Sequence, residues 1–271
     1  MPLDANLISI ALGLFTGLVL ALTGAGGSIL AIPLLAFGLH LSMAQAAPIG
    51  LLAVMLASSL GALQGLRAGI VRYKAATLIA GFGILFAPVG VWLAHRTSNQ
   101  HLSLIFAVVL GYVAWRMWQQ NTQNLQADEH KPAPACVLNP ATSRLFWTAP
   151  CTKRLMITGG LAGLLSGLLG VGGGFVIVPS LRKVSNFDMQ TIIATSLLAI
   201  AIVSAVSIST YLLHSDILWQ IAIPFAASTI VSMLAFRLAS PRIPAVISQR
   251  GFAALAIIAA LMLAARGFSA F

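Results

Sequence analysis

Gly167-Leu-Leu-Gly170-Val-Gly172-Gly173-Gly174-Phe-Val-Ile-Val-Pro179-Ser-Leu181 is an apolar stretch with four glycines in five positions, followed by a proline. A similar stretch, Gly24-Ala-Gly26-Gly27-Ser28-Ile-Leu-Ala-Ile-Pro33-Leu-Leu35, lies 146 residues earlier. The identical pairs at this spacing, found without a gap, are Gly24 and Gly170, Gly26 and Gly172, Gly27 and Gly173, Pro33 and Pro179, and Leu35 and Leu181. An ordered set of this length indicates an internal duplication. Each copy begins with a broken apolar segment.

The composition indicates a polytopic α-helical membrane protein with the lipid bilayer as its solvent. The chain has 271 residues, of which 59% are hydrophobic and only 7% charged, and its mean hydropathy is +0.98. A soluble domain carries charge on roughly a quarter of its residues. The net charge of +10 would favour nucleic acid in a soluble protein. In a membrane protein, an excess of Lys and Arg more often reflects the orientation of the chain in the membrane. The sequence has no basic run interleaved with aromatic residues, so nothing in it indicates nucleic-acid binding.

The apolar segments divide the chain into two membrane repeats, residues 1–118 and 154–271, joined by a polar linker, residues 119–153. Each repeat is predicted to hold one broken, glycine-rich segment and three transmembrane helices. The register between the two repeats is expected to drift by about one residue after the third span. The predicted segments are 6–39, 44–66, 75–94 and 102–118 in the first repeat, and 155–181, 189–213, 217–238 and 251–265 in the second.

The distribution of Lys and Arg predicts the topology. If every segment crossed the membrane once, the two sides would hold nine and six basic residues, which is a weak bias. If each broken segment enters and returns, as a re-entrant hairpin or as two short crossings, the inner side holds thirteen and the outer side two. The inner set is Arg67, Arg72, Lys74, Arg116, Lys131, Arg144, Lys153, Arg154, Arg182, Lys183, Arg237, Arg242 and Arg250; the outer set is Arg96 and Arg266.

The positive-inside rule prefers the second arrangement. It predicts an inner-membrane protein with both termini in the periplasm and the linker in the cytoplasm. Each repeat then crosses an odd number of times, so the repeats are inverted, which is a transporter architecture. Cys136 and Cys151 lie in the linker, at a spacing that fits no metal motif. We therefore expect them to be an incidental pair, reduced in the cytoplasm.

The broken segments are the predicted substrate site. Non-helical backbone survives at membrane depth only where protein or a water-filled cavity satisfies it. The helix after each break would direct amide groups and the positive end of its dipole into that cavity, which favours an anion. The predicted anion-binding residues are Gly26, Gly27 and Ser28 in the first repeat and Gly172, Gly173 and Gly174 in the second. Glycines spaced by three or four have an alternative explanation, the close packing of helices.

Thr195 and Ser196 add two hydroxyl groups near the start of an otherwise apolar span, and they complete the predicted site. An alternative is that these hydroxyls bond to the carbonyl one turn earlier, as is common in membrane helices. The first repeat has Ile49 and Gly50 at the equivalent positions. Polar side-chain ligands are therefore expected mostly from the second repeat.

The acidic residues exclude several mechanisms. Asp4, Asp128, Glu129, Asp188 and Asp216 all fall in predicted loops or at the ends of spans. No carboxylate is placed at mid-depth for a proton relay. The sequence has no phosphate-binding loop of the Walker A type, and no nucleophile and base share a membrane depth. We therefore predict that the chain is not an enzyme and uses neither a cofactor nor a metal.

The glycine stretch with its proline, the Thr195-Ser196-Leu197 that follows and the two-fold repeat resemble the sulfite exporter TauE/SafE family of membrane permeases. The resemblance covers nearly the whole chain and implies export of a small sulfur-containing anion, such as sulfite or an organosulfonate. Ser28, Ile49 and Gly50 depart from the family pattern in the first repeat. Two other functions fit the same residues: an anion channel, and a membrane assembly factor that transports nothing.

Overall fold

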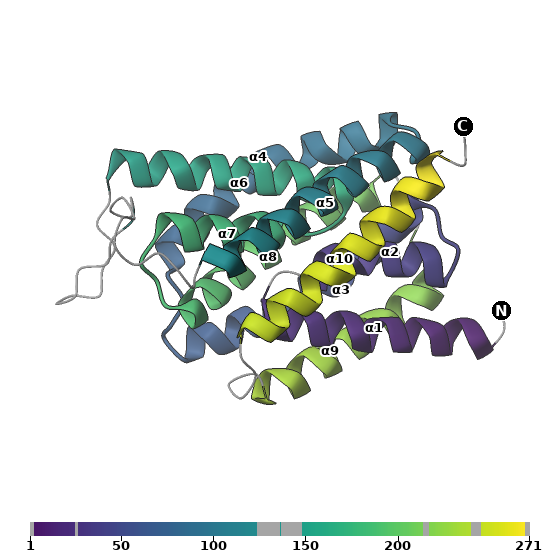
Figure 1. Ribbon diagram of the computed structural model, residues 1–271, viewed down its shortest axis with the longest axis horizontal. Helices are drawn as coiled ribbons and strands as arrows, with labels where there is room; N and C mark the ends of the chain where they lie inside the picture. Colours follow the sequence, from purple (N-terminus) through teal and green to yellow (C-terminus); the bar gives the residue numbers. More distant parts are fainter. Residues whose placement is uncertain are drawn as a thin grey trace.

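The fold is built from α-helices (Figure 1). The computed structural model describes residues 3–24, 27–123, 136, 148–213, 217–239 and 245–268. Within these residues there is no β-strand, and the one isolated bridge joins Cys136 and Ser185. The predicted all-α class is confirmed. The helices are α1 (Leu3–Thr23), α2 (Gly27–Gly38), α3 (Met43–Arg67), α4 (Tyr73–Arg96), α5 (Asn99–Gln123), α6 (Ala149–Leu169), α7 (Gly174–Val184), α8 (Met189–Leu212), α9 (Trp219–Ala239) and α10 (Ala245–Phe268).

The helices are those of a multi-pass membrane protein. Four of them, α3, α4, α8 and α9, are long and apolar enough to cross a membrane, and α1, α2, α5 and α10 contain shorter apolar stretches. Large apolar side chains face outward on α4, where Leu85 is 66% exposed and Trp92 is 54% exposed. A continuous apolar exterior of this kind is costly in water and matches a lipid environment.

The first broken segment is a helical hairpin. Gly27, at the start of α2, lies against Leu20 of α1, whereas Gly38, at the end of α2, lies against Leu12. Later residues of α2 therefore lie against earlier residues of α1, so α2 runs antiparallel to α1. With 12 residues, α2 is about 18 Å long, which is little more than half of the hydrocarbon thickness.

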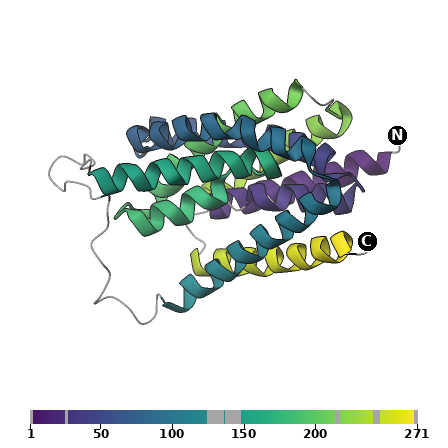
Figure 2. The ribbon, with the colours of Figure 1, turned by 90° about the horizontal axis from the view of Figure 1, so that it is seen from above.

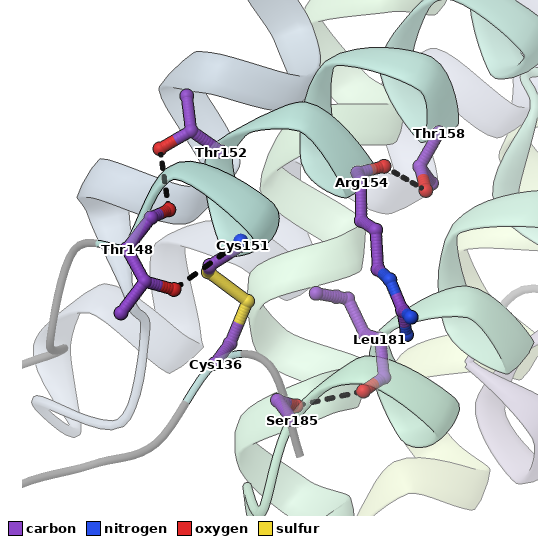
Figure 3. The surroundings of a disulfide bond; sticks show 8 residues. All are labelled: Cys136, Thr148, Cys151, Thr152, Arg154, Thr158, Leu181 and Ser185. Atoms are coloured by element: carbon purple, nitrogen blue, oxygen red, sulfur yellow. Dashed lines mark hydrogen bonds between the residues drawn. A yellow bond between two sulfur atoms is a disulfide. The ribbon is translucent and has the colours of Figure 1, made fainter. Parts of the chain in front are cut away.

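The second broken segment also reverses direction, and its two ends meet at the linker (Figure 3). Cys136 forms a disulfide with Cys151 in the first turn of α6, and its amide donates a 2.9 Å hydrogen bond to the carbonyl of Val184, the last residue of α7. The expectation of two incidental, reduced cysteines is therefore wrong. Their side chains are brought together because the linker pairs with the end of α7 at Ser185, directly beside the start of α6.

The helices of the two halves pack in corresponding pairs. α1 packs along α9 while α6 packs along α4, α3 packs against α8, and α5 lies beside α10 along one edge of the molecule (Figure 2). Four of the five corresponding helix pairs begin 146 residues apart, and α2 and α7 begin 147 apart. The spacing of 146 persists beyond the third span, so the expected drift of one residue is not found there. The equivalent starts are Leu3 and Ala149, Met43 and Met189, Tyr73 and Trp219, and Asn99 and Ala245.

Glycine contacts define the directions of the paired helices. Ile79 lies against Gly159 and Gly83 against Gly163, so α4 and α6 run in the same direction. α1 and α9 also run in the same direction, because Gly13 meets Phe225 and Gly17 meets Thr229. By contrast, Gly65 near the end of α3 meets Ala194 near the start of α8, so these two helices are antiparallel.

Several glycines act as packing residues, which was the alternative explanation. A Cβ atom at Gly163 would overlap the carbonyl oxygen of Gly83, and one at Gly167 would overlap that of Ala87. A Cβ at Gly13 would come within 2.5 Å of the Phe225 carbonyl oxygen. Without a side chain at these positions, the backbones of α6 and α4, and of α1 and α9, approach closely.

Candidate functional site

The second break is built from three glycines in the left-handed conformation. Gly170 ends α6 with φ 73°, and its amide donates a 2.8 Å hydrogen bond to the Ser166 carbonyl. Gly172 and Gly173 have φ values of 74° and 72°, and α7 begins at Gly174. This conformation costs other L-residues roughly 1–2 kcal/mol each, whereas glycine adopts it readily. The run of glycines that interrupts the sequence therefore reverses the chain within four residues.

The same glycines leave no room for a side chain. A Cβ at Gly170 would lie 2.5 Å from the Cβ of Ala47 on α3. A Cβ at Gly173 would lie 2.6 Å from the carbonyl oxygen of Ala162 on α6. One at Gly172 would lie 2.7 Å from Ser204 Oγ on α8. The break is thus enclosed by three different helices.

The first break has the corresponding features where it is described. Gly24 follows α1 with φ 71° and donates a 2.8 Å hydrogen bond to the Leu20 carbonyl. A Cβ at Gly27 would lie 2.6 Å from the Thr16 carbonyl oxygen, and Ser28 is completely buried. The predicted site residue Gly26 lies outside the described residues.

Each break lies against a long helix of the other half. Gly24 of the first half is in contact with Ile193 of α8, and Gly170 of the second half is in contact with Ala47 of α3. Val54, near the middle of α3, lies 3.0 Å from the position of a Cβ at Gly172. Because α3 and α8 are antiparallel, the contacts of Gly24 and of Gly170 lie toward opposite ends of this helix pair.

Thr195 and Ser196 are fully buried and make hydrogen bonds to backbone groups. Thr195 Oγ1 accepts a 3.0 Å hydrogen bond from the Arg72 amide, in the connection between α3 and α4. Ser196 Oγ donates a 2.9 Å hydrogen bond to the Ile193 carbonyl, as in the alternative explanation. These contacts hold the start of α8 in place. Thr195 and Ser196 lie about two helical turns before Ser204, an α8 residue at the second break.

Two other buried hydroxyl groups were missed by the sequence analysis. In the part of the chain that the structure describes, Ser58 Oγ on α3 and Ser204 Oγ on α8 are buried and make no hydrogen bond. Ser204 is one of the residues around Gly172. The two serines are 146 residues apart, so comparison of the repeats at that spacing was the signal that could have found them.

The first turn of α7 differs from those of three other helices. α3, α6 and α8 begin with side-chain caps, supplied by Ser42, Thr148 and Asp188 respectively. The N-cap residue of α7 is Gly173, which offers no side-chain acceptor to the amides of the first turn. Helix N-termini with unoccupied amides attract anions.

Asp188 caps α8 at the end of the span rather than within it, accepting a 3.1 Å hydrogen bond from the Gln190 amide. Within the residues that the structure describes, no group of three or more His, Cys, Asp and Glu side chains is arranged to hold a metal ion. The chemistry around the breaks is therefore that of backbone amides, hydroxyls and apolar side chains.

Comparison with known proteins supports a membrane permease. The model of the family described as "Sulfite exporter TauE/SafE" matches residues 9–263, which include both breaks and both long central helices. The chain belongs to the sulfite exporter TauE/SafE family. Two relatives in Xylella fastidiosa are both named probable membrane transporter protein. The one from strain Temecula1 is 28% identical over 251 residues, covering 89% of each chain.

The second TauE/SafE relative, from strain 9a5c, is 30% identical over 229 residues, covering 83% of this chain and 81% of its own. No solved structure matches this chain. The TauE/SafE match and the names of the relatives identify a membrane transporter rather than an enzyme.

Proposed function

We propose that the protein is a secondary transporter that exports a small sulfur-containing anion, of the sulfite or organosulfonate class, across the inner membrane. The observation that carries this proposal is the second break. Three glycines there allow the chain to reverse between α3, α6 and α8, and the first turn of α7 begins without a side-chain cap. Amides at such a helix start bind an oxyanion without a cationic side chain.

The proposed architecture is a pair of inverted repeats, residues 1–118 and 154–271, with residues 119–153 as the linker. The pairing of α1 with α9 and of α6 with α4 supports it, as do the shared direction within each pair and the antiparallel packing of α3 and α8. A transporter built in this way presents its substrate site at the interface of the repeats, where two states of similar energy are related by the symmetry.

The proposed orientation places the linker in the cytoplasm and both termini in the periplasm. Basic residues at the linker end support it, because Arg72 in the α3–α4 connection, Arg154 in α6 and Lys183 in α7 all lie near that end. The Cys136–Cys151 disulfide favours the opposite side, since disulfides persist mainly outside the cytoplasm. We give the charges more weight because thirteen of fifteen basic residues agree, whereas a single cytoplasmic pair of cysteines can be oxidised transiently.

A channel or an assembly factor remains a distinct alternative, and transport by purified protein separates them. Protein in liposomes loaded with unlabelled ethanesulfonate should take up external labelled ethanesulfonate by counterflow that saturates. Large single-channel currents in a planar bilayer would instead indicate a pore. Neither counterflow nor current, together with a melting temperature that no anion changes, would indicate an assembly role.

A further inference from the structure

We infer that Ser58 and Ser204 are the side-chain ligands of the transported anion, one from each half of the chain. This inference rests on the proposed function and assigns the site to residues outside the predicted set. The first observation is that both hydroxyls are buried, in residues with 0% exposure, and make no hydrogen bond within the described structure. Leaving a buried hydroxyl without a hydrogen bond costs about 1–3 kcal/mol. A bound ligand that accepts this hydrogen bond would remove the cost.

Neighbouring hydroxyls on the same two helices do not share that state. Ser59, next to Ser58, donates a 2.7 Å hydrogen bond to the Met55 carbonyl. Ser207, one turn after Ser204, donates a 3.0 Å hydrogen bond to the Val203 carbonyl and also lies 3.1 Å from Ser166 Oγ. Bonding to the carbonyl one turn earlier is the usual solution for serine in a membrane helix. Ser58 and Ser204 have this option and do not use it.

The position of Ser204 connects the hydroxyl to the helix break. Its Oγ atom lies 2.7 Å from the place of a Cβ at Gly172, so it is directed at the glycine backbone that precedes α7. Val54 Cγ1 and Ile200 Cγ2 bound the same position, at 3.0 Å and 3.3 Å. An anion accepting from Ser204 Oγ would lie beside the uncapped first turn of α7.

The position of Ser58 follows from the packing of α3 and α8. Val54, one turn earlier on the same face of α3, also contacts the Gly172 position. Gly65 of α3 lies against Ala194 of α8. Because the two helices are antiparallel, Ser58, seven residues before Gly65, is level with Ala201, seven residues after Ala194. Ser204 is three residues further on, an axial offset of about 4.5 Å. The two hydroxyls are therefore within about one helical turn of each other along the helix pair.

This set of donors selects a singly charged oxyanion. α8 contains no Lys or Arg, and the only one in α3 is Arg67, its last residue. The cost of desolvating an ion rises steeply with its charge, and hydroxyls with helix amides supply only partial positive charge. A sulfonate or a hydrogen sulfite anion satisfies these conditions better than sulfate, which carries two charges.

The test measures binding to the purified full-length protein in detergent by thermal shift and by calorimetry, with potassium ethanesulfonate as the probe and potassium sulfate as the comparison. Ser58→Ala, Ser204→Ala and the double variant are compared with Ser59→Ala and Ser207→Ala as controls. We expect the Kd for ethanesulfonate to rise about tenfold or more in each Ser58 and Ser204 variant. The controls should bind as the wild type does, and sulfate should bind at least tenfold more weakly than ethanesulfonate.

The melting temperature without anion separates a ligand role from a structural one. Ser58→Ala and Ser204→Ala should leave it unchanged or raise it, because each removes an unpaired buried group. Ser207→Ala should lower it, because Ser166 loses a partner. An unchanged Kd in the double variant would overturn the inference while leaving the proposed function standing. A melting temperature that Ser58→Ala or Ser204→Ala lowers in the absence of anion would also overturn the inference. If the wild type binds no sulfonate or sulfite at all, the proposed function fails and the inference fails with it.

Discussion

The amide of Arg72 donates a 3.0 Å hydrogen bond to Thr195 Oγ1, which joins the connection between α3 and α4 to the start of α8. The Thr195 hydroxyl, which was predicted from the sequence to bind the anion, thus holds the α3–α4 connection of the other half in place. Arg72 is the residue directly before α4, so this bond also positions the first turn of that helix.

Thr195→Val tests the role of this hydrogen bond. The variant keeps the shape of the side chain and removes the acceptor from the part-buried Arg72 amide, which should destabilise the protein by about 1 kcal/mol. Ser196→Ala, which removes only a local bond to the Ile193 carbonyl, should cost less. Thermal unfolding in detergent gives the stability, and titration with ethanesulfonate gives the affinity. If both variants lost affinity for ethanesulfonate while their stability stayed unchanged, Thr195 and Ser196 would be anion ligands after all.

The glycines of the second break should not tolerate a side chain. Gly173→Leu should abolish transport, because it combines a positive φ of 72° with a clash against the Ala162 carbonyl. The matched control is Gly81→Leu on α4, where no atom lies within 4 Å of a new Cβ, and it should transport normally. Flux is measured in liposomes at equal amounts of inserted protein. Normal flux in Gly173→Leu would mean that this backbone is not part of the pathway.

The predictions from sequence succeeded where the repeat pattern fixes the backbone. The α3, α4 and α8 bounds lie within two residues of the predicted spans. The apolar runs of α3 and α4 end at Arg67 and Arg96, and that of α8 ends at Leu213. The glycine stretches also mark where the helices stop, since contiguous glycines cannot continue a helix at low cost.

The roles of the hydroxyls and cysteines could not be predicted from the sequence, because they depend on contacts between distant segments. Ser58 and Ser59 are adjacent and chemically identical, and only the packing of α3 against α8 leaves one of them unpaired. Cys136 meets Cys151 because the linker pairs with Ser185, which no local pattern predicts.

The disulfide should contribute to stability by closing a loop at the linker end. Its sequence separation is 15 residues, for which chain entropy predicts about 3 kcal/mol. The double variant Cys136→Ser/Cys151→Ser should therefore unfold at a lower temperature, and added reductant should lower the melting temperature of the wild type but not of the double variant. Equal sensitivity of both proteins to reductant would show that the bond does not hold α6, α7 and the linker together.

Orientation can be measured in the cysteine-free double variant. A single new cysteine at Asn6, near the start of α1, should react with a membrane-impermeant maleimide in intact cells, because the proposed topology places that end in the periplasm. A second cysteine at Thr152, near the disulfide, should react only after the cells are permeabilised. The reversed pattern would place the linker outside and make the disulfide a permanent bond of the oxidising compartment.

We propose that the anion moves alone through a site without acidic groups, so that the direction of transport follows the membrane potential. An inside-negative potential contributes about 2.3 kcal/mol per charge per 100 mV. For a singly charged anion at about 100 mV, this energy supports an outside-to-inside concentration ratio of roughly fifty without a coupling ion. The most direct measurement is the efflux of labelled ethanesulfonate from proteoliposomes under an inside-negative potassium diffusion potential, with and without sodium. We expect faster efflux with increasing potential and no effect of sodium. Uphill uptake driven by a sodium or proton gradient alone would contradict it.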